Sequence, residues 1–420
     1  MSRASRPLLT SLTLLCLALA PCAAASDTAP PAAVPRGASR ETQLRLEALG
    51  YSENATDDPD PSRRGVTRND PDAMPGVNYY CTNASVRFVA MDGAILHEVP
   101  LELAASPGSG CLAELYRDRE VVTVGSPLLS MLRLGGQPRW SKLGPYHHDV
   151  GIDATGLLYA LRRFDSVLTR GDAKLPITGQ AIDVLHGKGR AQRSIDLTPM
   201  LAPMIPEERV RRIAEAVASR GRIGKEEFAH ALDVFHPNTV EVVDWPHAPG
   251  GGRRVLIAVR QLDRIMVIDL DERRIVWEWG AGQIVGPHDP WLLPNGNVLL
   301  FDNGVRPTQE PAPSVRMFSR VVEVDPRTDR IVWEYRGDPP QSFFSPSRGG
   351  AQPLQNGNVL VTETTKGRAF EVTRAGKIVW EYWNPDFHDG ARRALYRMHR
   401  IGLDEYRALR GWREGNAPAD

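Results

Sequence analysis

This sequence of 420 residues has no excess of positive or negative charge, few cysteines and no long apolar run. Basic and acidic residues number 51 each, so nothing favours nucleic acid or an anionic membrane surface as the main partner. The longest apolar run, residues 8–20, is too short for a transmembrane segment. A hydrophobic content of 42% is ordinary for a globular protein, and the length allows one large β domain or two average domains.

The apolar run at residues 8–20 has the features of a secretory signal peptide. Two arginines precede it, and the small residues Ala23–Ala25 provide a cleavage site. We therefore expect residues 1–25 to be removed and the mature chain to be periplasmic or secreted. A lipoprotein cleavage box ending at Cys22 is the open alternative, although Pro21 directly before it disfavours that processing.

Only four cysteines occur, and two of them lie in the signal peptide. The remaining pair, Cys81 and Cys111, most simply forms one disulfide in an exported chain. Closing a loop of about 30 residues stabilises a fold by roughly 3–4 kcal/mol in the chain-entropy description. Two free, buried thiols are the alternative.

Composition divides the rest of the chain into three parts. Residues 26–77 are rich in Ala, Pro, Asp and Arg and predict a disordered leader with an N-terminal extension. Residues 78–385 carry β patterns, and residues 386–420 form a C-terminal extension. Within the β region, residues 206–232 break the pattern: Pro206 and two acids open an apolar helical repeat, which predicts a helical insertion. The insertion is either decoration or a lid over one face.

The β region repeats a hairpin whose second strand carries tryptophan. Each copy is a short strand, a turn and a second strand, and the second strands are Arg274–Trp279, Arg330–Tyr335 and Lys377–Tyr382. Their first tryptophans follow one another after 56 and 47 residues. Periods of about 40–50 residues with about four short strands each predict an all-β fold, a β-propeller. We expect the tryptophans to pack between blades rather than to take part in chemistry.

A second repeat brings histidine to one register. His148, His288 and Gly349 each lie eight residues before a turn glycine, and His236 stands in a similar context before another strand. A position needed only for packing would more often keep one residue type. The variation therefore indicates a site where repeats converge, although a single histidine of this kind is more often structural.

Counting from the same glycines gives a neighbouring register with its own polar residues. Arg163, Asn303 and Thr364 share one position, and Arg260 ends its own strand at an equivalent point. Equivalent positions near inner strands face the central channel of a propeller. Imidazole and guanidinium groups together suit an anion with several oxygens. A metal site is the alternative, but no HxH or HExxH spacing supports it, and arginine disfavours a cation.

These motifs resemble the arylsulfotransferase family of exported bacterial proteins. The resemblance covers roughly residues 78–385, and it rests on His148-Asp149 with Gly156, Phe235-His236-Pro237-Asn238, Val259-Arg260, Pro287-His288-Asp289-Pro290, Phe301-Asp302-Asn303-Gly304 and the Ile-Val-Trp-Glu repeats. It implies a six-bladed β-propeller that transfers a sulfuryl group from a phenolic sulfate ester to a phenol acceptor. It also implies no nucleotide donor, no other cofactor and a transiently sulfated histidine.

The resemblance assigns roles by motif. His288 matches the nucleophile, and Thr362 is a neighbouring candidate for the role assigned to Thr364. The residues that match substrate contacts are His148, His236, Asn238, Arg260 and Thr364. The chain departs from the family in its shorter length, its 206–232 insertion and the lack of a convincing separate N-terminal β domain. These departures bear on acceptor choice and assembly more than on the chemistry.

The implied chemistry is physically sensible. Neutral imidazole is nucleophilic near neutral pH, and sulfuryl transfer, like phosphoryl transfer, needs in-line positioning and stabilised equatorial oxygens. One of the other channel histidines, as imidazolium, could protonate the leaving phenolate. Two other functions stay open: a non-catalytic envelope propeller that binds an anionic ligand or a protein partner, and a metal-dependent propeller hydrolase.

Overall fold

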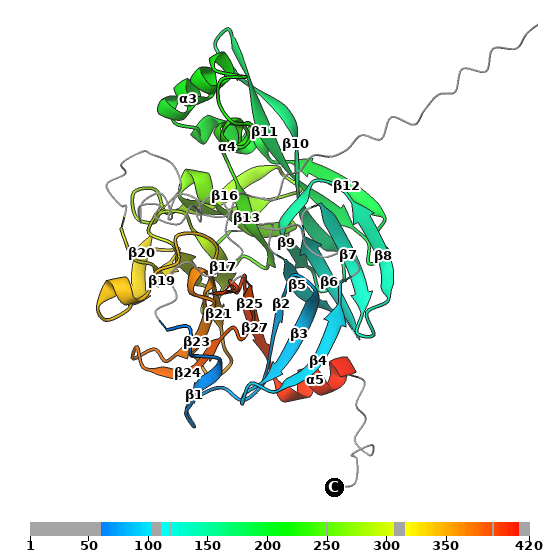
Figure 1. The fold of residues 1–420 in the computed structure, drawn as a ribbon. Helices are drawn as coiled ribbons and strands as arrows, with labels where there is room; N and C mark the ends of the chain where they lie inside the picture. The colour runs from blue at the N-terminus through cyan, green and yellow to red at the C-terminus, as the bar shows by residue number, and fades with distance from the viewer. Residues whose placement is uncertain are drawn as a thin grey trace, which may run out of the picture.

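The protein is a six-bladed β-propeller, as Figure 1 shows in a computed structural model. The structure describes residues 60–101, 111–117, 119–125, 127–248, 251–305, 316–388 and 390–410. The expected signal peptide and most of the expected leader therefore lie outside the described residues. The prediction of an all-β propeller is confirmed.

Each blade is an antiparallel meander that runs from the central axis outward, and the first strands of most neighbouring blades touch one another. Blade 1 contains β27 (Met398–Ile401), β2 (Val77–Cys81), β3 (Ser85–Ala90) and β4 (Ile95–Pro100). Blade 2 contains β5 (Leu112–Tyr116), β6 (Glu120–Gly125), β7 (Leu128–Arg133) and β8 (Pro138–Leu143). Blade 3 contains β9 (Tyr146–Ile152), β10 (Leu158–Arg170), β11 (Ala173–Leu185) and β12 (Ala191–Asp196).

The second half of the ring follows the same plan. Blade 4 contains β13 (Pro237–Val243), β14 (Arg254–Val259), β15 (Arg264–Asp269) and β16 (Arg274–Trp279). Blade 5 contains β17 (His288–Leu292), β18 (Val298–Asp302), β19 (Arg320–Asp325) and β20 (Arg330–Tyr335). Blade 6 contains β21 (Gly350–Pro353), β22 (Val359–Glu363), β23 (Arg368–Val372), β24 (Ile378–Trp383) and, at its outer edge, β1 (Gly65–Asn69).

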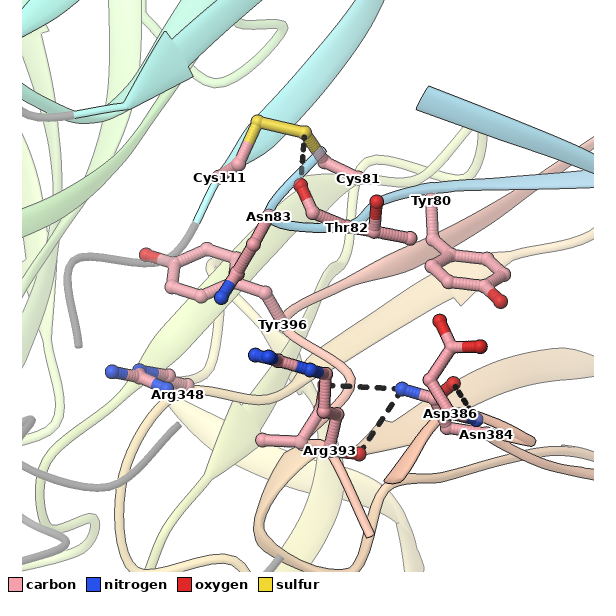
Figure 2. A pocket seen from close by; sticks show the side chains of 11 residues that line it. Tyr80, Cys81, Thr82, Asn83, Cys111, Arg348, Asn384, Asp386, Arg393 and Tyr396 are labelled. Carbon is pink, nitrogen blue, oxygen red and sulfur yellow. Dashed lines mark hydrogen bonds between the residues drawn. A yellow bond between two sulfur atoms is a disulfide. The ribbon is translucent and has the colours of Figure 1, made fainter. Parts of the chain in front are cut away.

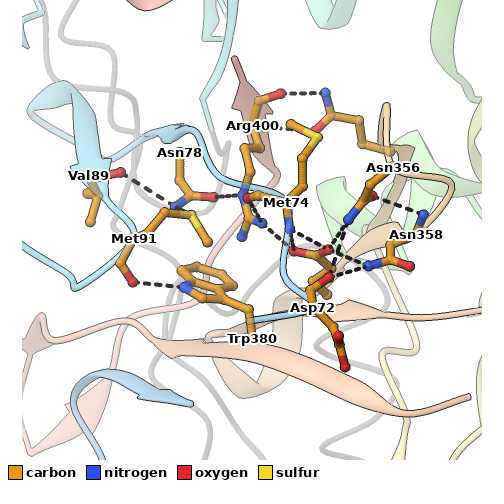
Figure 3. Close-up of polar contacts among 11 residues, drawn as sticks. Asp72, Met74, Asn78, Val89, Met91, Asn356, Asn358, Trp380 and Arg400 are labelled. Carbon is orange, nitrogen blue, oxygen red and sulfur yellow. Dashed lines mark hydrogen bonds and ion pairs between the residues drawn. The ribbon is translucent and has the colours of Figure 1, made fainter. Parts of the chain in front are cut away.

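Both ends of the described chain close the ring. β27 enters blade 1 as its innermost strand, and β1 pairs with β24 of blade 6, so the sheets extend beyond the expected range 78–385 on both sides. Arg400 of β27 is 2% exposed and forms an ion pair with Glu371 of blade 6 (Figure 3). Its Nε donates to the Asn78 side chain at 2.8 Å, and its guanidinium lies 4.5 Å from the Trp380 ring centre. This buried cluster joins blade 6 to blade 1.

The repeated tryptophans bind one blade to the next. The ring N–H of Trp333, on the last strand of blade 5, donates to the Arg374 carbonyl in a turn of blade 6 at 2.9 Å. Trp380 of blade 6 donates in the same way to the Met91 carbonyl of blade 1 at 3.0 Å. Trp277 of blade 4 donates to the Asp329 side chain of blade 5 at 3.3 Å. The repeat thus exists because each ring N–H meets the next blade's outer turn.

The turn glycines hold the repeat in register. Gly156, Gly296 and Gly357 all have φ of 85°, a left-handed conformation that residues with a Cβ rarely adopt. Each one lies in the turn between the first and second strands of its blade. Residues at the same spacing from these turns therefore occupy equivalent positions in the three blades.

The predicted helical insertion forms an arm on one side of the propeller (Figure 1). It contains α2 (Thr198–Leu201), η1 (Ala202–Met204), α3 (Glu207–Ala218) and α4 (Lys225–Leu232), between blades 3 and 4. β10 and β11 are 13 residues each, and the helices pack on β11. Ile213 is fully buried, as the helical spacing of apolar residues predicts.

The remaining short elements lie between strands or after the last one. They are η2 (Arg260–Leu262), η3 (Pro340–Ser342), η4 (Thr364–Lys366), β25 (Phe387–His388), β26 (Ala391–Arg392) and α5 (Leu403–Arg410). α5 packs its Leu409 and Tyr406 against the core of blade 1. Within the described residues, none of the helices combines the length and apolar character that a membrane crossing requires.

Candidate active site

Three of the predicted histidines stand where innermost strands begin. His148 lies in β9, His236 directly precedes β13, and His288 starts β17. The blade 6 counterpart is glycine for a steric reason. Gly349 has φ of 107°, and a Cβ there would lie 2.7 Å from the Phe301 ring. The variation at this register thus separates three polar positions from one that has no room for a side chain.

His288 has one tautomer imposed by its neighbours. Its Nδ1 faces two acceptors, the Gly286 carbonyl at 2.9 Å and the Asn303 Oδ1 at 2.7 Å. Asn303 presents its oxygen because its amide group donates to the carbonyls of Ser345 at 2.7 Å and Arg348 at 2.6 Å. Nδ1 must therefore carry the proton, and the lone pair is left on Nε2. Nε2 makes no hydrogen bond within the described part of the chain.

The other two histidines belong to a hydrogen-bonded chain. Asp233 Oδ2 lies 2.6 Å from His236 Nδ1, and His236 Nε2 lies 3.1 Å from His148 Nε2. His148 Nδ1 in turn lies 2.8 Å from His147 Nδ1. His147 Nε2 ends the chain at the Gln180 Oε1, 3.1 Å away. The structure therefore brings His148 and His236 together and adds His147, which lies one residue out of the repeat register.

Arg260 and Asn238 connect these histidines to one another. The backbone N–H of Arg260 donates to the His236 carbonyl at 3.3 Å. Arg260 is buried and only 5% exposed. The Asn238 amide donates to the carbonyl of Pro287 at 2.9 Å, directly before His288. Asn238 thus anchors the segment that carries His288, and blade 4 positions blade 5.

Thr364 sits at the equivalent position of blade 6, but its hydroxyl is used elsewhere. It donates to the Tyr396 carbonyl at 2.9 Å and shows no bond to the histidines among the described contacts. The neighbouring candidate Thr362 accepts the backbone N–H of Met398 at 3.0 Å. Both hydroxyls hold the C-terminal segment against blade 6 in this structure.

The residues after His148 and His288 are aspartates that share one partner. Asp149 and Asp289 both face the Arg397 guanidinium, at 3.4 Å and 3.3 Å. Asp149 also accepts the backbone N–H of Val240 at 3.1 Å, and Asp289 accepts that of Ala351 at 2.8 Å. One buried arginine therefore ties blades 3 and 5 together directly beside the histidines.

Burial disfavours the charged form of each imidazole. Burial, followed by the charge of Arg260, lowers the pKa of His288 well below its ordinary value. Burial also lowers the pKa of His147 and His148 well below that value, and it lowers the pKa of His236 despite the opposing Asp233. Burial alone would raise the pKa of Asp233, but His236 brings it below its ordinary value, so this carboxylate is ionised.

Arginine gives this layer an excess of positive charge. Burial lowers the pKa of Arg260 to about 10, which still leaves it charged at neutral pH. The charge of Arg163 acts on His147, and the charge of Arg348 acts on Arg260. Because Asp233 is paired with His236, the site favours an anion. Among the described residues, no group of three or more His, Cys, Asp or Glu side chains is arranged to hold a metal ion.

A polar pocket adjoins this layer (Figure 2). It is lined by Tyr80, Cys81, Thr82, Asn83, Cys111, Arg348, Asn384, Asp386, Arg393, Ala394 and Tyr396. The carbonyls of Arg348 and Tyr396 accept the bonds from Asn303 and Thr364, so the pocket shares its wall with the histidine site. Figure 2 shows the disulfide at one end of the pocket and Arg393 toward the other.

The helical arm supplies part of the site. Asp233, the partner of His236, directly follows α4, and Gln180 lies on β11 beneath the arm. Arg209 of α3 donates to the Gln261 side chain at 3.0 Å, directly beside Arg260. The arm therefore does more than decorate the propeller, because its residues hold the histidine chain and the segment of Arg260.

Comparison with known proteins identifies the second half of the ring. Residues 206–385 match the arylsulfotransferase family model. Over these residues the chain is similar to the arylsulfotransferase family. The arylsulfotransferase match spans α3 and α4 of the arm and blades 4 to 6 apart from β1, a region that includes His236, Arg260 and His288. His148 and Arg397 lie outside it and join the site through the ring. No curated protein matches the chain.

Among solved structures, one similar chain supports the propeller fold. A protein of unknown function from Bacteroides caccae is 12% identical, with a TM-score of 0.50, over 78% of this chain and 99% of its own. A streptogramin B lyase is 12% identical, with a TM-score of 0.43, over 83% and 97%. A virginiamycin B lyase from Staphylococcus aureus is 10% identical, with a TM-score of 0.42, over 78% and 91%. The two lyase likenesses are too weak to bear on function.

Proposed function

We propose that the protein is an aryl-sulfate sulfotransferase that works through a sulfated His288. The observation that carries this proposal is the tautomer of His288: its Nδ1–H is held by Gly286 and Asn303, which leaves the Nε2 lone pair for attack. The lowered pKa keeps that lone pair available at neutral pH. The similarity of residues 206–385 to the arylsulfotransferase family supports the choice of a sulfuryl group.

The reaction has two half-reactions. His288 Nε2 attacks the sulfur of a phenolic sulfate ester, the ester S–O bond breaks, and its electron pair leaves with the phenolate oxygen. A phenol acceptor then attacks the sulfated His288, the S–N bond breaks, and its electron pair returns to Nε2, while the phenol proton passes to His148 or His236. The positive charge on the sulfated ring is stabilised because Nδ1–H donates to two oxygens.

The other predicted residues act on the sulfuryl oxygens or on the groups that hold them. Arg260 offers charged donors to equatorial oxygens in a water-poor site, where such interactions are strong. His148 and His236, whose Nε2 atoms lie 3.1 Å apart, take the other contacts to the sulfuryl group. Asn238 and Thr364 position the segments of His288 and Tyr396. No nucleotide or other cofactor takes part, and the partners are a small phenolic sulfate and a phenol. In line with the expected signal peptide, the protein would act in the periplasm or outside the cell.

The test is turnover of 4-nitrophenyl sulfate with and without a phenol acceptor, on protein treated with a chelator and analysed for metals. We expect acceptor-dependent nitrophenol release, with one added sulfuryl group on His288 by mass spectrometry. His288→Asn should abolish both. The control is His97→Gln, which should retain both, because His97 lies in blade 1 and its ring bonds to the Leu134 carbonyl of blade 2.

Three results would contradict the proposal. Absence of turnover and of sulfated His288 across many phenols would favour a propeller that only binds anions. Binding of 4-nitrophenyl sulfate without turnover, which His288→Asn leaves unchanged, would favour the same alternative. A stoichiometric metal that turnover requires would favour a hydrolase.

A further inference from the structure

His147 is a buried imidazole that the proposed reaction does not use directly. It is 2% exposed, whereas His148 and His236 are partly exposed. Its two ring nitrogens both have partners, His148 Nδ1 and the Gln180 Oε1. Because both ring nitrogens of His147 have partners, the position of its proton determines whether His148 Nδ1 donates or accepts.

The chain from Asp233 to Gln180 has an acceptor at both ends. Asp233 is a carboxylate, and Gln180 presents its oxygen to His147. The orientation of Gln180 is set by Asp233, because the Gln180 amide group faces the second carboxylate oxygen at 3.5 Å. Turning the amide over would bring two oxygens together. The two ends therefore accept protons and donate none.

A proton count follows from this arrangement. The chain has four links, and each link needs one proton: Asp233 to His236, His236 to His148, His148 to His147, and His147 to Gln180. Three neutral imidazoles hold only three protons. The connected chain therefore carries one proton more than three neutral rings.

The ends also decide which proton is exchangeable. Asp233 holds a proton on His236 Nδ1, and Gln180 holds one on His147 Nε2. His147 Nδ1 is then an acceptor, so His148 keeps its own proton on Nδ1. The remaining proton lies between the two Nε2 atoms, 3.1 Å apart, and its loss leaves every other link intact and all three rings neutral.

We propose that His147, held by Gln180, is a positioning residue that makes the His148–His236 pair share one transferable proton for the sulfotransferase reaction. This inference rests on the proposed function. In the first half-reaction, the shared proton moves to the leaving phenolate oxygen, which departs as a phenol. In the second, the acceptor phenol returns a proton to one Nε2 as its oxygen attacks sulfur. The proton count balances over the cycle without solvent.

Charges around the chain limit it to one extra proton. Arg163 from β10, Arg260 from η2, His230 from α4 and His288 from β17 all face these imidazoles. Each of these groups, when positive, disfavours further protonation, while Asp233 balances the shared proton. These charges thus allow one extra proton on the histidine chain beside the sulfuryl group and disfavour a second extra proton.

Gln180 offers a matched pair of test variants. Gln180→Met keeps the side-chain length and removes the acceptor, so His147 can move its proton to Nδ1 and the chain is satisfied with three protons. Gln180→Glu keeps the acceptor and adds a negative charge. Leaving-group basicity separates acid catalysis from folding, because phenolate needs protonation more than 4-nitrophenolate does.

We expect Gln180→Met to lower turnover of phenyl sulfate about 100-fold or more and that of 4-nitrophenyl sulfate by roughly threefold at most. For Gln180→Glu, activity with phenyl sulfate should persist, and its alkaline limb should move to higher pH because the added carboxylate holds the proton more tightly. Equal losses of both donors in Gln180→Met, or an unmoved alkaline limb in Gln180→Glu, would overturn the proposal.

Nitrogen NMR of the histidine-labelled full chain tests the proton count without turnover. The expected spectrum has His147 protonated on Nε2, His148 and His236 protonated on Nδ1, and one further proton shared between their Nε2 atoms. His147 protonated on Nδ1 alone would overturn the proposal. If the wild type turns over neither donor, the proposed function fails, and the spectrum still decides the proton arrangement.

Discussion

Asn303 accepts the Nδ1 proton of His288 at 2.7 Å, and the carbonyls of Ser345 and Arg348 keep its amide from turning. Asn303 belongs to the turn after β18, and the two carbonyls belong to the loop before β21. The tautomer of the proposed nucleophile is therefore set where blades 5 and 6 meet. A neighbouring blade thus controls the reactivity of a residue on an innermost strand.

Asn303→Leu should lower kcat about 10- to 100-fold with little change in the KM of the sulfate donor. The reason is that His288 loses one of two acceptors that hold its proton on Nδ1, and such orienting partners are typically worth that factor. Steady-state kinetics with 4-nitrophenyl sulfate measure it. Asn356→Leu, which alters a turn of blade 6, is the control and should change kcat far less. An unchanged kcat in Asn303→Leu would show that the tautomer is not limiting.

Arg260→Met should move the acid limb of the first half-reaction to higher pH. The neutral form of His288 is the nucleophile, so the rate falls only when pH drops through its lowered pKa. Removing the Arg260 charge makes the imidazolium less unfavourable and raises that pKa, while burial still keeps it below the ordinary value. Single-turnover nitrophenol release against pH measures the limb. Arg264→Met, which removes a partner of Glu278 on blade 4, should leave it in place. A limb that stays or moves to lower pH in Arg260→Met contradicts the assignment.

The repeat pattern was enough to predict the propeller because its signals are local. A tryptophan that meets the next turn, and a glycine with φ of 85°, each act within one hairpin or its neighbour. The closing strand β27 could not be found in this way. Its four residues, Met398–Ile401, include His399 and Arg400 and show no apolar alternation. Their place depends on Glu371 and Asn78, which are brought near only by closure of the ring.

The candidate site could be predicted from the sequence only where the local repeat marks its residues. His148, His236 and His288 stand at strand starts that the repeat marks. Gln180 and Arg397 carry no such mark, because only the folded ring brings them to the histidines. His147 is one residue out of the repeat register, so the repeat does not mark it. The left-handed backbone of His148, with φ of 59°, lets adjacent imidazoles meet through their Nδ1 atoms, which a regular strand would point to opposite faces. The repeated pairs His148-Asp149 and His288-Asp289 could have indicated that the two aspartates share one cation, which is Arg397.

Reduction of the Cys81–Cys111 disulfide should lower the free energy of unfolding by about 3–4 kcal/mol, since it closes a loop with a sequence separation of 30. The predicted bridge is confirmed, with 5.4 Å between the two Cα atoms, and it joins the end of β2 to the start of β5. Because both cysteines line the pocket, donor affinity is a second readout. Urea unfolding with and without reductant measures the difference. The Cys81→Ser/Cys111→Ser variant, insensitive to reductant, is the control, and equal midpoints in the oxidised and reduced wild type would contradict the estimate.

Arg400→Met should cost about 3–5 kcal/mol of stability, because it leaves the carboxylate of Glu371 buried without its cation. Both side chains have no exposed surface, and Glu371 also accepts the Met74 N–H at 2.9 Å and the Asn358 amide at 2.6 Å. Adding Glu371→Gln should recover part of the loss, since the unpaired charge is removed while the polar acceptor remains. Arg407→Met, in an exposed pair with Asp404 on α5, should change stability little. Equilibrium unfolding of the four proteins separates the cases. Closely similar stabilities of Arg400→Met and Arg407→Met would mean that ring closure does not depend on this buried pair.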